Sequence, residues 1–255
     1  MREALPASAL PPPATMNIFL AGATGAIGLP SIRILVGRGH RVFAMTRQAE
    51  RGSALWALGA IPVVVDAFDA DALGLALRAI RPDAVLDHLT DLATIHQPGK
   101  LVEALGRNAE LRRTGTANLV AAARSAGVAS MVAQSIGWIY RAGREPHEEQ
   151  DPLDVDATGT LGVTIDGVVA LERAILDTPG LRGCVLRYGR IYGPRTGDDE
   201  AGRIELPLHV EAAAWAGVLA LEKQAAGIFN VAEPNRYAST ERIRRETGWH
   251  ESLRA

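Results

Sequence analysis

The fold of this chain is decided by the stretch Asn17-Ile18-Phe19-Leu20-Ala21-Gly22-Ala23-Thr24-Gly25-Ala26-Ile27-Gly28. An apolar strand leads into three glycines, each separated from the next by two residues, and a helical pattern follows. Gly22 lets the chain turn sharply off the strand, Gly25 lets a phosphate approach the backbone, and Gly28 lets the helix pack against the strand. Because helix N-termini attract anions, the stretch predicts a dinucleotide-binding turn rather than a plain strand-to-helix turn.

The residues after the glycines complete a strand–helix–strand unit, with a second strand at 41–45. In this arrangement an acidic residue at the end of the second strand would accept a hydrogen bond from the ribose 2′-hydroxyl of NAD. Here Arg47 follows the strand, and Arg51 lies one helical turn further on. Because arginines suit a 2′-phosphate, the sequence predicts NADP rather than NAD. The alternative is that Arg47 is simply a solvated side chain.

The rest of the chain repeats the alternation of strand and helix. Further apolar runs predict strands at 61–66, 83–90, 129–135, 181–186 and 227–231, with helical patterns at 50–58, 70–80, 100–126, 165–176, 211–222 and 239–247. This alternation is typical of an α/β protein. Because the nucleotide occupies the first part, substrate contacts are expected from the last part.

Composition excludes several classes of protein. The 255 residues are 47% hydrophobic and 22% charged, and the net charge of −2 gives no support for a nucleic-acid partner or an anionic membrane surface. No apolar run approaches the roughly 20 residues of a membrane helix. The single cysteine, Cys184, lies in an apolar run, so a core thiol is favoured over a nucleophile or a metal ligand, and no metal site is predicted. A chain without an internal disulfide fits the cytoplasm.

Residues 1–15 differ from the rest because they are rich in proline and lack a long apolar centre. A signal peptide is therefore not expected. We predict a disordered N-terminal extension, or a natural start at Met16, which stands immediately before the first strand.

Several polar residues come at the ends of the predicted strands, where open α/β sheets bind ligands. Asp66 ends the third strand, and it either accepts a hydrogen bond from an adenine amino group or caps the following turn. His88 lies inside the apolar fourth strand, which favours a hydrogen-bonded core histidine. Ser135 ends the fifth strand, where its hydroxyl either meets a ligand or bonds to backbone.

Together these motifs resemble the extended short-chain dehydrogenase/reductase superfamily, in particular its NAD-dependent epimerase/dehydratase group. The resemblance covers about residues 16–255 and rests on segments 22–28, 39–42, 115–119, 186–194 and 209–213 and on the strand that bears Ser135. It implies a doubly wound parallel sheet of seven strands, the Rossmann fold, with a small C-terminal substrate lobe. The implied domains are a dinucleotide-binding domain at 16–192 and the lobe at 193–255, which is not an independent domain.

The resemblance also implies a set of cofactor-binding residues. They are Gly22, Thr24, Gly25, Ala26, Ile27, Gly28, Arg47, Asp66, Ala67, Leu89, Thr90, Ser135 and Tyr188. Family members often form dimers through two long helices, which correspond here to about 100–126 and 162–177.

The sequence departs from the family at the catalytic positions. Active members use a tyrosine as the acid and a lysine four residues later, which holds the nicotinamide ribose. Counting back from Glu172 places these positions on Thr164 and Val168, and no Tyr-x-x-x-Lys occurs in the chain. An aliphatic hydroxyl is too weak an acid to replace a phenol. The remaining catalytic candidates are Ser135, with its register open by one residue, and Tyr140.

Two functions follow from these observations. The first is an atypical NADP-dependent oxidoreductase or epimerase-like enzyme that acts on a small carbonyl or hydroxyl compound, with Ser135 and a water or Tyr140 serving the proton. The second is a non-catalytic redox sensor that binds NADP and contacts a partner. The short connection from Pro194 to His209 argues against a nucleotide-sugar substrate.

Overall fold

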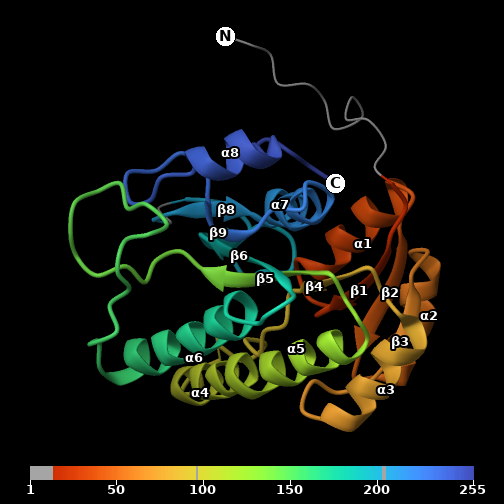
Figure 1. Ribbon diagram of the computed structural model, residues 1–255. Coiled ribbons are helices and arrows are strands. Elements are labelled where there is room, and N and C mark those ends of the chain that lie inside the picture. Colours follow the sequence, from red (N-terminus) through yellow and green to blue (C-terminus); the bar gives the residue numbers. More distant parts are fainter. Residues whose placement is uncertain (1–13, 96, 203–204) are drawn as a thin grey trace.

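The body of the protein is a parallel sheet whose strand order brings the first strand to the middle. The computed structural model describes residues 14–95, 97–202 and 205–255, so residues 1–13 of the predicted extension lie outside the described part. The strands are β1 (Asn17–Ala21), β2 (Arg41–Thr46), β3 (Ile61–Val64), β4 (Ala84–Asp87), β5 (Ser130–Ile136), β6 (Arg182–Tyr188) and β9 (Gly227–Val231). They lie in the order β3-β2-β1-β4-β5-β6-β9, and every neighbouring pair is parallel (Figure 1). The predicted seven-stranded Rossmann fold is confirmed.

The strand order reverses between β1 and β4. The chain proceeds outward from β1 to β3 and then returns to place β4 on the other side of β1. In open α/β sheets ligands bind outside the carboxyl ends of the strands at such a switch point. The glycine turn after β1 lies at this place.

Helices cover both faces of the sheet. One face carries α1 (Gly28–Gly37), α2 (Gly52–Ala57), α7 (Val210–Glu222) and α8 (Glu241–Thr247), and the other carries α3 (Ala70–Ile80), α4 (Leu101–Glu110), α5 (Thr116–Ser125) and α6 (Gly159–Leu176). Side chains of a strand alternate between the two faces, so Ile18 and Leu20 enter one core while Phe19 and Ala21 enter the other. We call these the α7 face and the α6 face.

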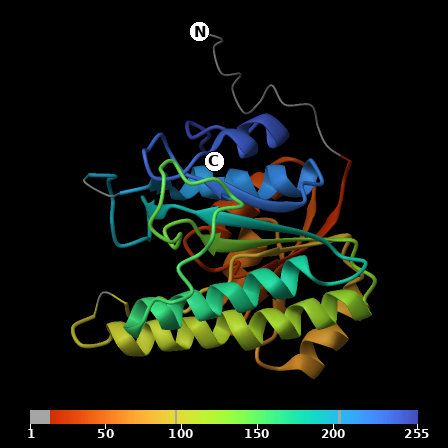
Figure 2. The ribbon, with the colours of Figure 1, turned by 60° about the vertical axis from the view of Figure 1, so that its left-hand side comes forward.

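The long helix predicted at 100–126 is present, and a π-helical turn divides it. This turn, Leu111–Gly115, joins α4 to α5 without a break in direction (Figure 2). Helix α6 runs alongside at a close approach, because a Cβ on Gly167 would lie 2.8 Å from Ala109 Cα. Helix α6 begins at Gly159, earlier than the predicted 165, so Thr164 and Val168 lie well inside it.

The last part of the chain contributes to the same core. Strands β7 (Arg190–Tyr192) and β8 (Pro207–His209) form a small parallel sheet, after which α7 packs against the sheet with almost every side chain buried. Strand β9 then completes the edge of the main sheet. The lobe predicted at 193–255 therefore shares its core with the dinucleotide-binding part.

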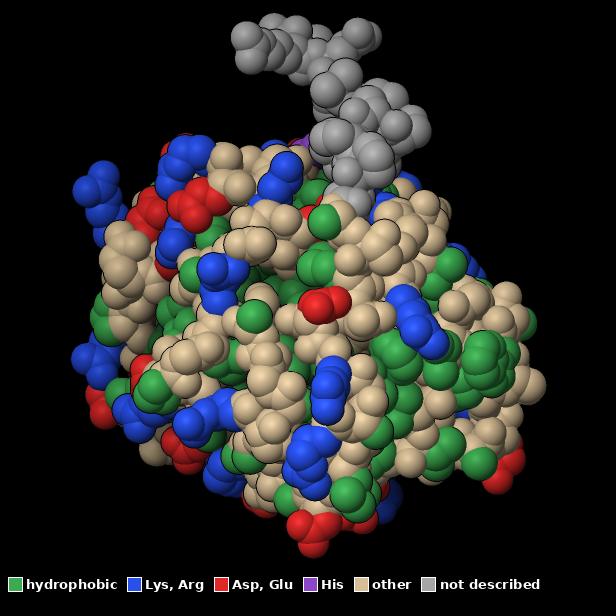
Figure 3. Space-filling view, turned by 45° about the vertical axis from the view of Figure 1, so that its right-hand side comes forward, with side chains coloured by type: hydrophobic (Ala, Val, Ile, Leu, Met, Phe, Trp, Pro, Cys, Tyr) green, Lys and Arg blue, Asp and Glu red, His purple; other side chains and the backbone are tan. Residues whose placement is uncertain are grey.

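Large hydrophobic side chains are exposed at the β3 edge of the sheet. Figure 3, which brings the side of α2, β3 and α3 forward, shows hydrophobic side chains gathered there. The exposed large hydrophobic residues of this region are Trp56, Val64, Phe68 and Leu75.

No helix in the described ranges is long and apolar enough to cross a lipid bilayer.

Candidate active site

The glycine turn has the geometry that a bound pyrophosphate requires. Gly22 has a positive φ of 75°, and a Cβ there would lie 2.4 Å from the carbonyl oxygen of His88. A Cβ on Gly28 would lie 2.2 Å from the carbonyl oxygen of Gly22, so the start of α1 packs directly on the turn. At Gly25 a Cβ would meet only that same oxygen, at 3.2 Å, and would otherwise enter open space. A side chain at Gly25 would fill this space, so the turn fits a dinucleotide.

The adenosine end of the predicted site is formed by the ends of β2 and β3. Arg47 is exposed directly after β2, and the Nε of Arg51 donates to Gln48 Oε1 at 2.5 Å. Asp66 Oδ1 accepts from the backbone N–H of Phe68 at 2.9 Å, which is the turn-capping alternative. Asn118 Nδ2 donates to the carbonyl oxygen of Ala67 at 3.0 Å and so fixes this turn to α5.

The carboxyl end of β4 passes beside the glycine turn. The His88 N–H donates to the Ala21 carbonyl oxygen at 3.0 Å, and Leu89 and Thr90 follow with partly exposed and exposed side chains. His88 is buried, its Nε2 lies 3.3 Å from Ser31 Oγ, and burial lowers its pKa to about 3. His88 is therefore a neutral core histidine, as predicted from its apolar strand.

The two positions that should carry the acid and the cation are buried and unreactive. Thr164, Val168 and Glu172 follow one another at intervals of four residues on a single face of α6. The Thr164 hydroxyl donates to the carbonyl oxygen of Thr160 at 2.8 Å, within its own helix. Val168 packs in an apolar cluster with Ile136, Ile139 and Ile165. Neither position offers an ionisable group.

Ser135 and Tyr140 both have partners inside the protein. Ser135 is fully buried, and its hydroxyl donates to Glu172 Oε1 at 2.8 Å. The Tyr140 hydroxyl donates to Asn230 Oδ1 at 2.7 Å and accepts from Arg187 Nη1 at 2.9 Å, while burial raises its pKa. The catalytic roles of Ser135 and Tyr140 remain predictions, and this geometry does not favour them.

The residue next to Ser135 does not supply the missing group either. Ile136 ends β5, and its apolar side chain packs with Val168 on α6. If the family's hydroxyl position falls one residue later than Ser135, it is occupied by an isoleucine, which has no hydroxyl.

A buried polar layer crosses the sheet on its α6 face. Ser135 on β5 is in register with Arg187 on β6, which is in register with Asn230 on β9. Arg187 donates to both carboxylate oxygens of Glu172, from Nη2 at 2.7 Å and from Nε at 2.9 Å. This pair is charge-assisted and bidentate, so it holds α6 firmly on the sheet.

Tyr188 lies on the opposite face of the sheet. Its side chain is buried, and its hydroxyl donates to the carbonyl oxygen of Ala213 at 2.8 Å. The side chain is therefore part of the core beneath α7, and its contact with the cofactor stays a prediction. Cys184 is also buried on this face, and burial raises the pKa of its thiol to about 12.

Two charged residues of the α6 face were not singled out from the sequence. Arg112 stands in the π turn, is 4% exposed, and interacts electrostatically with Glu172 and Asp87. Asp87 ends β4, where its Oδ1 accepts from the Leu89 N–H at 2.9 Å while its buried Oδ2 has no partner in the described part of the chain. Burial raises the pKa of Asp87 to about 6. The available signal was a charge at the end of an apolar strand and an arginine inside a helix that packs on the sheet.

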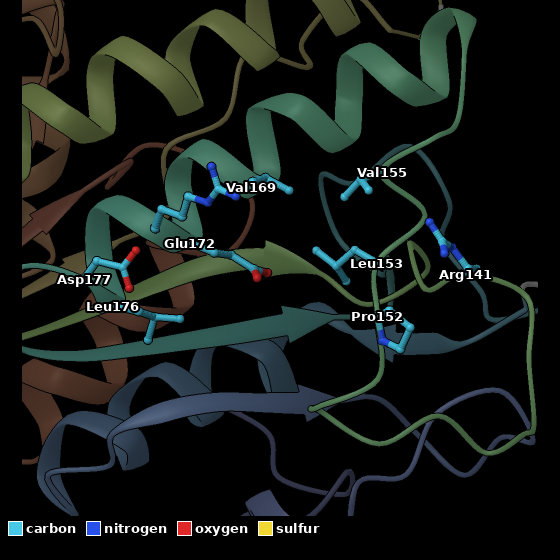
Figure 4. A pocket seen from close by; sticks show the side chains of 9 residues that line it. Arg141, Pro152, Leu153, Val155, Val169, Glu172, Leu176 and Asp177 are labelled. Carbon is cyan, nitrogen blue, oxygen red and sulfur yellow. The ribbon is translucent and has the colours of Figure 1, made fainter.

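A cavity of about 370 Å³ runs along the flank of α6 (Figure 4). Its lining comes from α6 and from the segment that precedes it: Arg141, Pro152, Leu153, Val155, Val169, Glu172, Arg173, Leu176 and Asp177. The Glu172 carboxylate that reaches this cavity is already bound by Ser135 and Arg187.

The fold and the glycine turn together define a dinucleotide-binding α/β protein. The family model for the NAD dependent epimerase/dehydratase family matches residues 18–216. A 3-diazoavenalumate denitrifying reductase of a Streptomyces species is 38% identical over 238 residues, which cover 86% of this chain and 76% of the relative. The chain therefore belongs to the NAD-dependent epimerase/dehydratase family, whose members depend on a nicotinamide cofactor.

Solved structures of this family share the fold. UDP-glucose 4-epimerase from Brucella ovis in complex with NAD has a TM-score of 0.74 at 19% identity, with 94% of each chain covered. UDP-N-acetylglucosamine 4-epimerase from Bacillus cereus has a TM-score of 0.73 at 18% identity, again with 94% of each chain covered. At these identities the likeness shows the fold alone.

Proposed function

We propose that this protein is an NADPH-dependent reductase that transfers a hydride to a small, strongly electrophilic substrate without an acid supplied by a side chain. One observation supports this most directly. The glycine turn fits a dinucleotide, while each hydroxyl near the usual acid position already donates inside the protein, Thr164 to Thr160, Ser135 to Glu172 and Tyr140 to Asn230. When bound, the cofactor supplies two electrons and a proton as hydride.

The absence of a free acid bears on the substrate class. Reduction of a carbonyl compound, the class predicted from the sequence, develops negative charge on oxygen and relies on a general acid. A diazo carbon compound in its diazonium form carries positive charge instead, so hydride addition neutralises it. Such a substrate requires no proton in the hydride step and suits a site without tyrosine and lysine.

The reductase from Streptomyces supports this choice, because its name describes loss of nitrogen from a diazo compound. The balanced reaction adds hydride to the terminal nitrogen of an aryl diazonium, which gives the neutral aryl diazene. The diazene then releases N₂, and its hydrogen remains on the aryl carbon. NADPH is oxidised to NADP⁺, and one N₂ leaves for each hydride. We therefore propose an aromatic diazo acid as the substrate class.

Arg47 supports NADP over NAD within this proposal. Its side chain is exposed directly after β2, and no hydrogen bond joins it to another residue in the described ranges. The guanidinium is therefore available to a 2′-phosphate, for which arginine is well suited.

The test is a comparison of substrates with the purified protein. We expect NADPH oxidation with 3-diazoavenalumate, with one N₂ released per NADPH, and little oxidation with aromatic aldehydes and ketones. The Gly25→Val variant, whose side chain fills the phosphate cradle, serves as the inactive control. Preferential reduction of the carbonyl compounds would contradict the proposal. Tight NADPH binding without oxidation by any substrate would favour the redox sensor.

A further inference from the structure

We propose that Arg112 binds the cofactor, with its guanidinium donating hydrogen bonds to a neutral oxygen of the nicotinamide half of the dinucleotide. The inference deepens the proposed function, on which it rests for the presence of the cofactor. It assigns a ligand contact to a residue that lies on α4–α5 rather than on α6.

The first argument is that Arg112 is a buried cation without a hydrogen bond. Arg112 is 4% exposed, and no hydrogen bond or ion pair within 4.0 Å joins its side chain to any residue of the described ranges. A guanidinium carries five N–H donors. None of the Arg112 nitrogens is among the side-chain atoms that are cut off from solvent without a partner, so its donors still face open space. A ligand that enters this space is the natural candidate for their partner.

The second argument is the position of Arg112 in the fold. The side chain interacts electrostatically with Asp87 at the carboxyl end of β4. Asp87 is in register with Ala21, and the next residues along the two strands, His88 and Gly22, are in close backbone contact. The charge of Arg112 therefore acts at the end of β4 that borders the glycine turn, where a dinucleotide crosses the strand ends in this fold.

The local backbone supports a role in binding. Arg112 is in a five-residue π-helical turn between two regular helices. Turns of this kind are uncommon and occur frequently at functional sites. Here the π turn packs against α6, and the Arg112 side chain is buried.

The two lysines and the buried Arg187 do not take this place. The chain has two lysines, of which Lys100 is exposed and donates to Glu103 at 2.8 Å, and Lys223 follows the end of α7. Arg187 is buried nearby, but its donors are bound by Glu172, Tyr140 and the Glu149 carbonyl oxygen.

The charge balance indicates a neutral acceptor rather than an anion. Asp87 and Glu172 are the two carboxylates that act on Arg112, and Glu172 is already paired with Arg187. Asp87 thus balances the Arg112 charge, and a carboxylate of a substrate would be repelled by Asp87. A ribose hydroxyl or a carboxamide oxygen accepts hydrogen bonds without adding charge.

The test compares two ligands by isothermal titration calorimetry. NADPH contains the nicotinamide half, whereas 2′,5′-ADP contains only the adenosine half with its 2′-phosphate. We expect Arg112→Met to weaken NADPH binding by about tenfold or more and to leave 2′,5′-ADP binding unchanged. The NADPH affinity of Arg112→Lys should lie between that of the wild type and that of Arg112→Met. Arg113→Met is the matched control, because Arg113 is exposed and pairs with Glu110. This variant should bind both ligands normally.

Three outcomes would overturn the inference. Unchanged NADPH affinity in Arg112→Met would mean that the residue acts only within the protein, even if the KM for the substrate rose. An equal loss for both ligands would indicate a general disturbance of the fold. If Arg112→Met does not fold because Asp87 has lost its balancing charge, the double variant Asp87→Asn/Arg112→Met is used instead. Its NADPH affinity is then compared with that of Asp87→Asn alone, and the same outcomes apply. Wild-type protein that binds neither ligand would overturn the proposed function as well.

Discussion

Single residues decide the chemistry of this site, because the positions that usually carry an acid and a cation hold Thr164 and Val168. The Thr164 hydroxyl donates within its own helix, and Val168 is buried among isoleucines. Pattern recognition along the chain was sufficient to predict both replacements. It could not predict that Ser135 donates to Glu172, because that hydrogen bond joins residues 37 positions apart and depends on how α6 lies on the sheet.

A prediction at this scale concerns Arg47 and the choice of cofactor. Replacing Arg47 by alanine removes the guanidinium that we expect at the 2′-phosphate. The Kd for NADP should rise by about tenfold or more, whereas the Kd for NAD should stay nearly constant. Titration calorimetry with both cofactors measures the difference. Arg33→Ala, an exposed arginine on α1, is the control, and equal affinity of the wild-type protein for NADP and NAD would refute the prediction.

At the scale of elements, the strands and helices followed from the sequence because their apolar periodicity is strong. The long helix at 100–126 was predicted, but its π turn was not, since nothing in the local pattern distinguishes five π-helical residues from an ordinary turn of α-helix. Arg112 was also missed, because a charged residue within a helix is usually assigned to the solvent side. Arg112 follows the buried Ala104 and Asn108 at intervals of four residues, so helical spacing was the signal that could have placed it on the inner face.

A second prediction concerns the ion pair that joins α7 to the start of β2. Glu222 accepts from Arg38 at 2.5 and 2.7 Å and contacts His40 at 3.0 Å, and its side chain is 4% exposed. Glu222→Gln should lower the free energy of unfolding at neutral pH by about 3 kcal/mol, because Arg38 would lose a buried partner. Urea unfolding measures the loss. Glu246→Gln, which removes an exposed pair with Arg242, should cost less than about 1 kcal/mol.

The same pair predicts a dependence on pH. Burial raises the pKa of Glu222, but the hydrogen bonds from His40 and Arg38 outweigh this effect, and the pKa is lowered overall. The stabilisation is therefore complete above the pKa of the unfolded chain and is lost as the pH falls through the lower pKa of the folded protein. Glu222→Gln should lose less stability on acidification than the wild type. Parallel acid titrations of the two proteins would contradict this account.

At the scale of the whole molecule, the sheet order places the glycine turn, the end of β4 and the α6 layer around one switch point. The outer surface of the α6 layer also bears exposed Leu101, Val102, Leu161 and Val163 on α4 and α6. These side chains are compatible with the predicted homodimer through the two long helices, which stays a proposal. The overall fold was accessible from the sequence because it depends on many residues, whereas the site depends on a few contacts between distant segments.

The central claim is that hydride transfer proceeds here without a protein acid, and isotope effects on a single turnover test it directly. The rate of NADPH oxidation by 3-diazoavenalumate is measured with NADPH deuterated at nicotinamide C4, and separately with ordinary NADPH in D₂O. We predict a clearly slower reaction with the deuterated cofactor and no change in D₂O beyond experimental error. A solvent isotope effect as large as that of the deuterated cofactor, or no oxidation by the diazo compound, would contradict the claim.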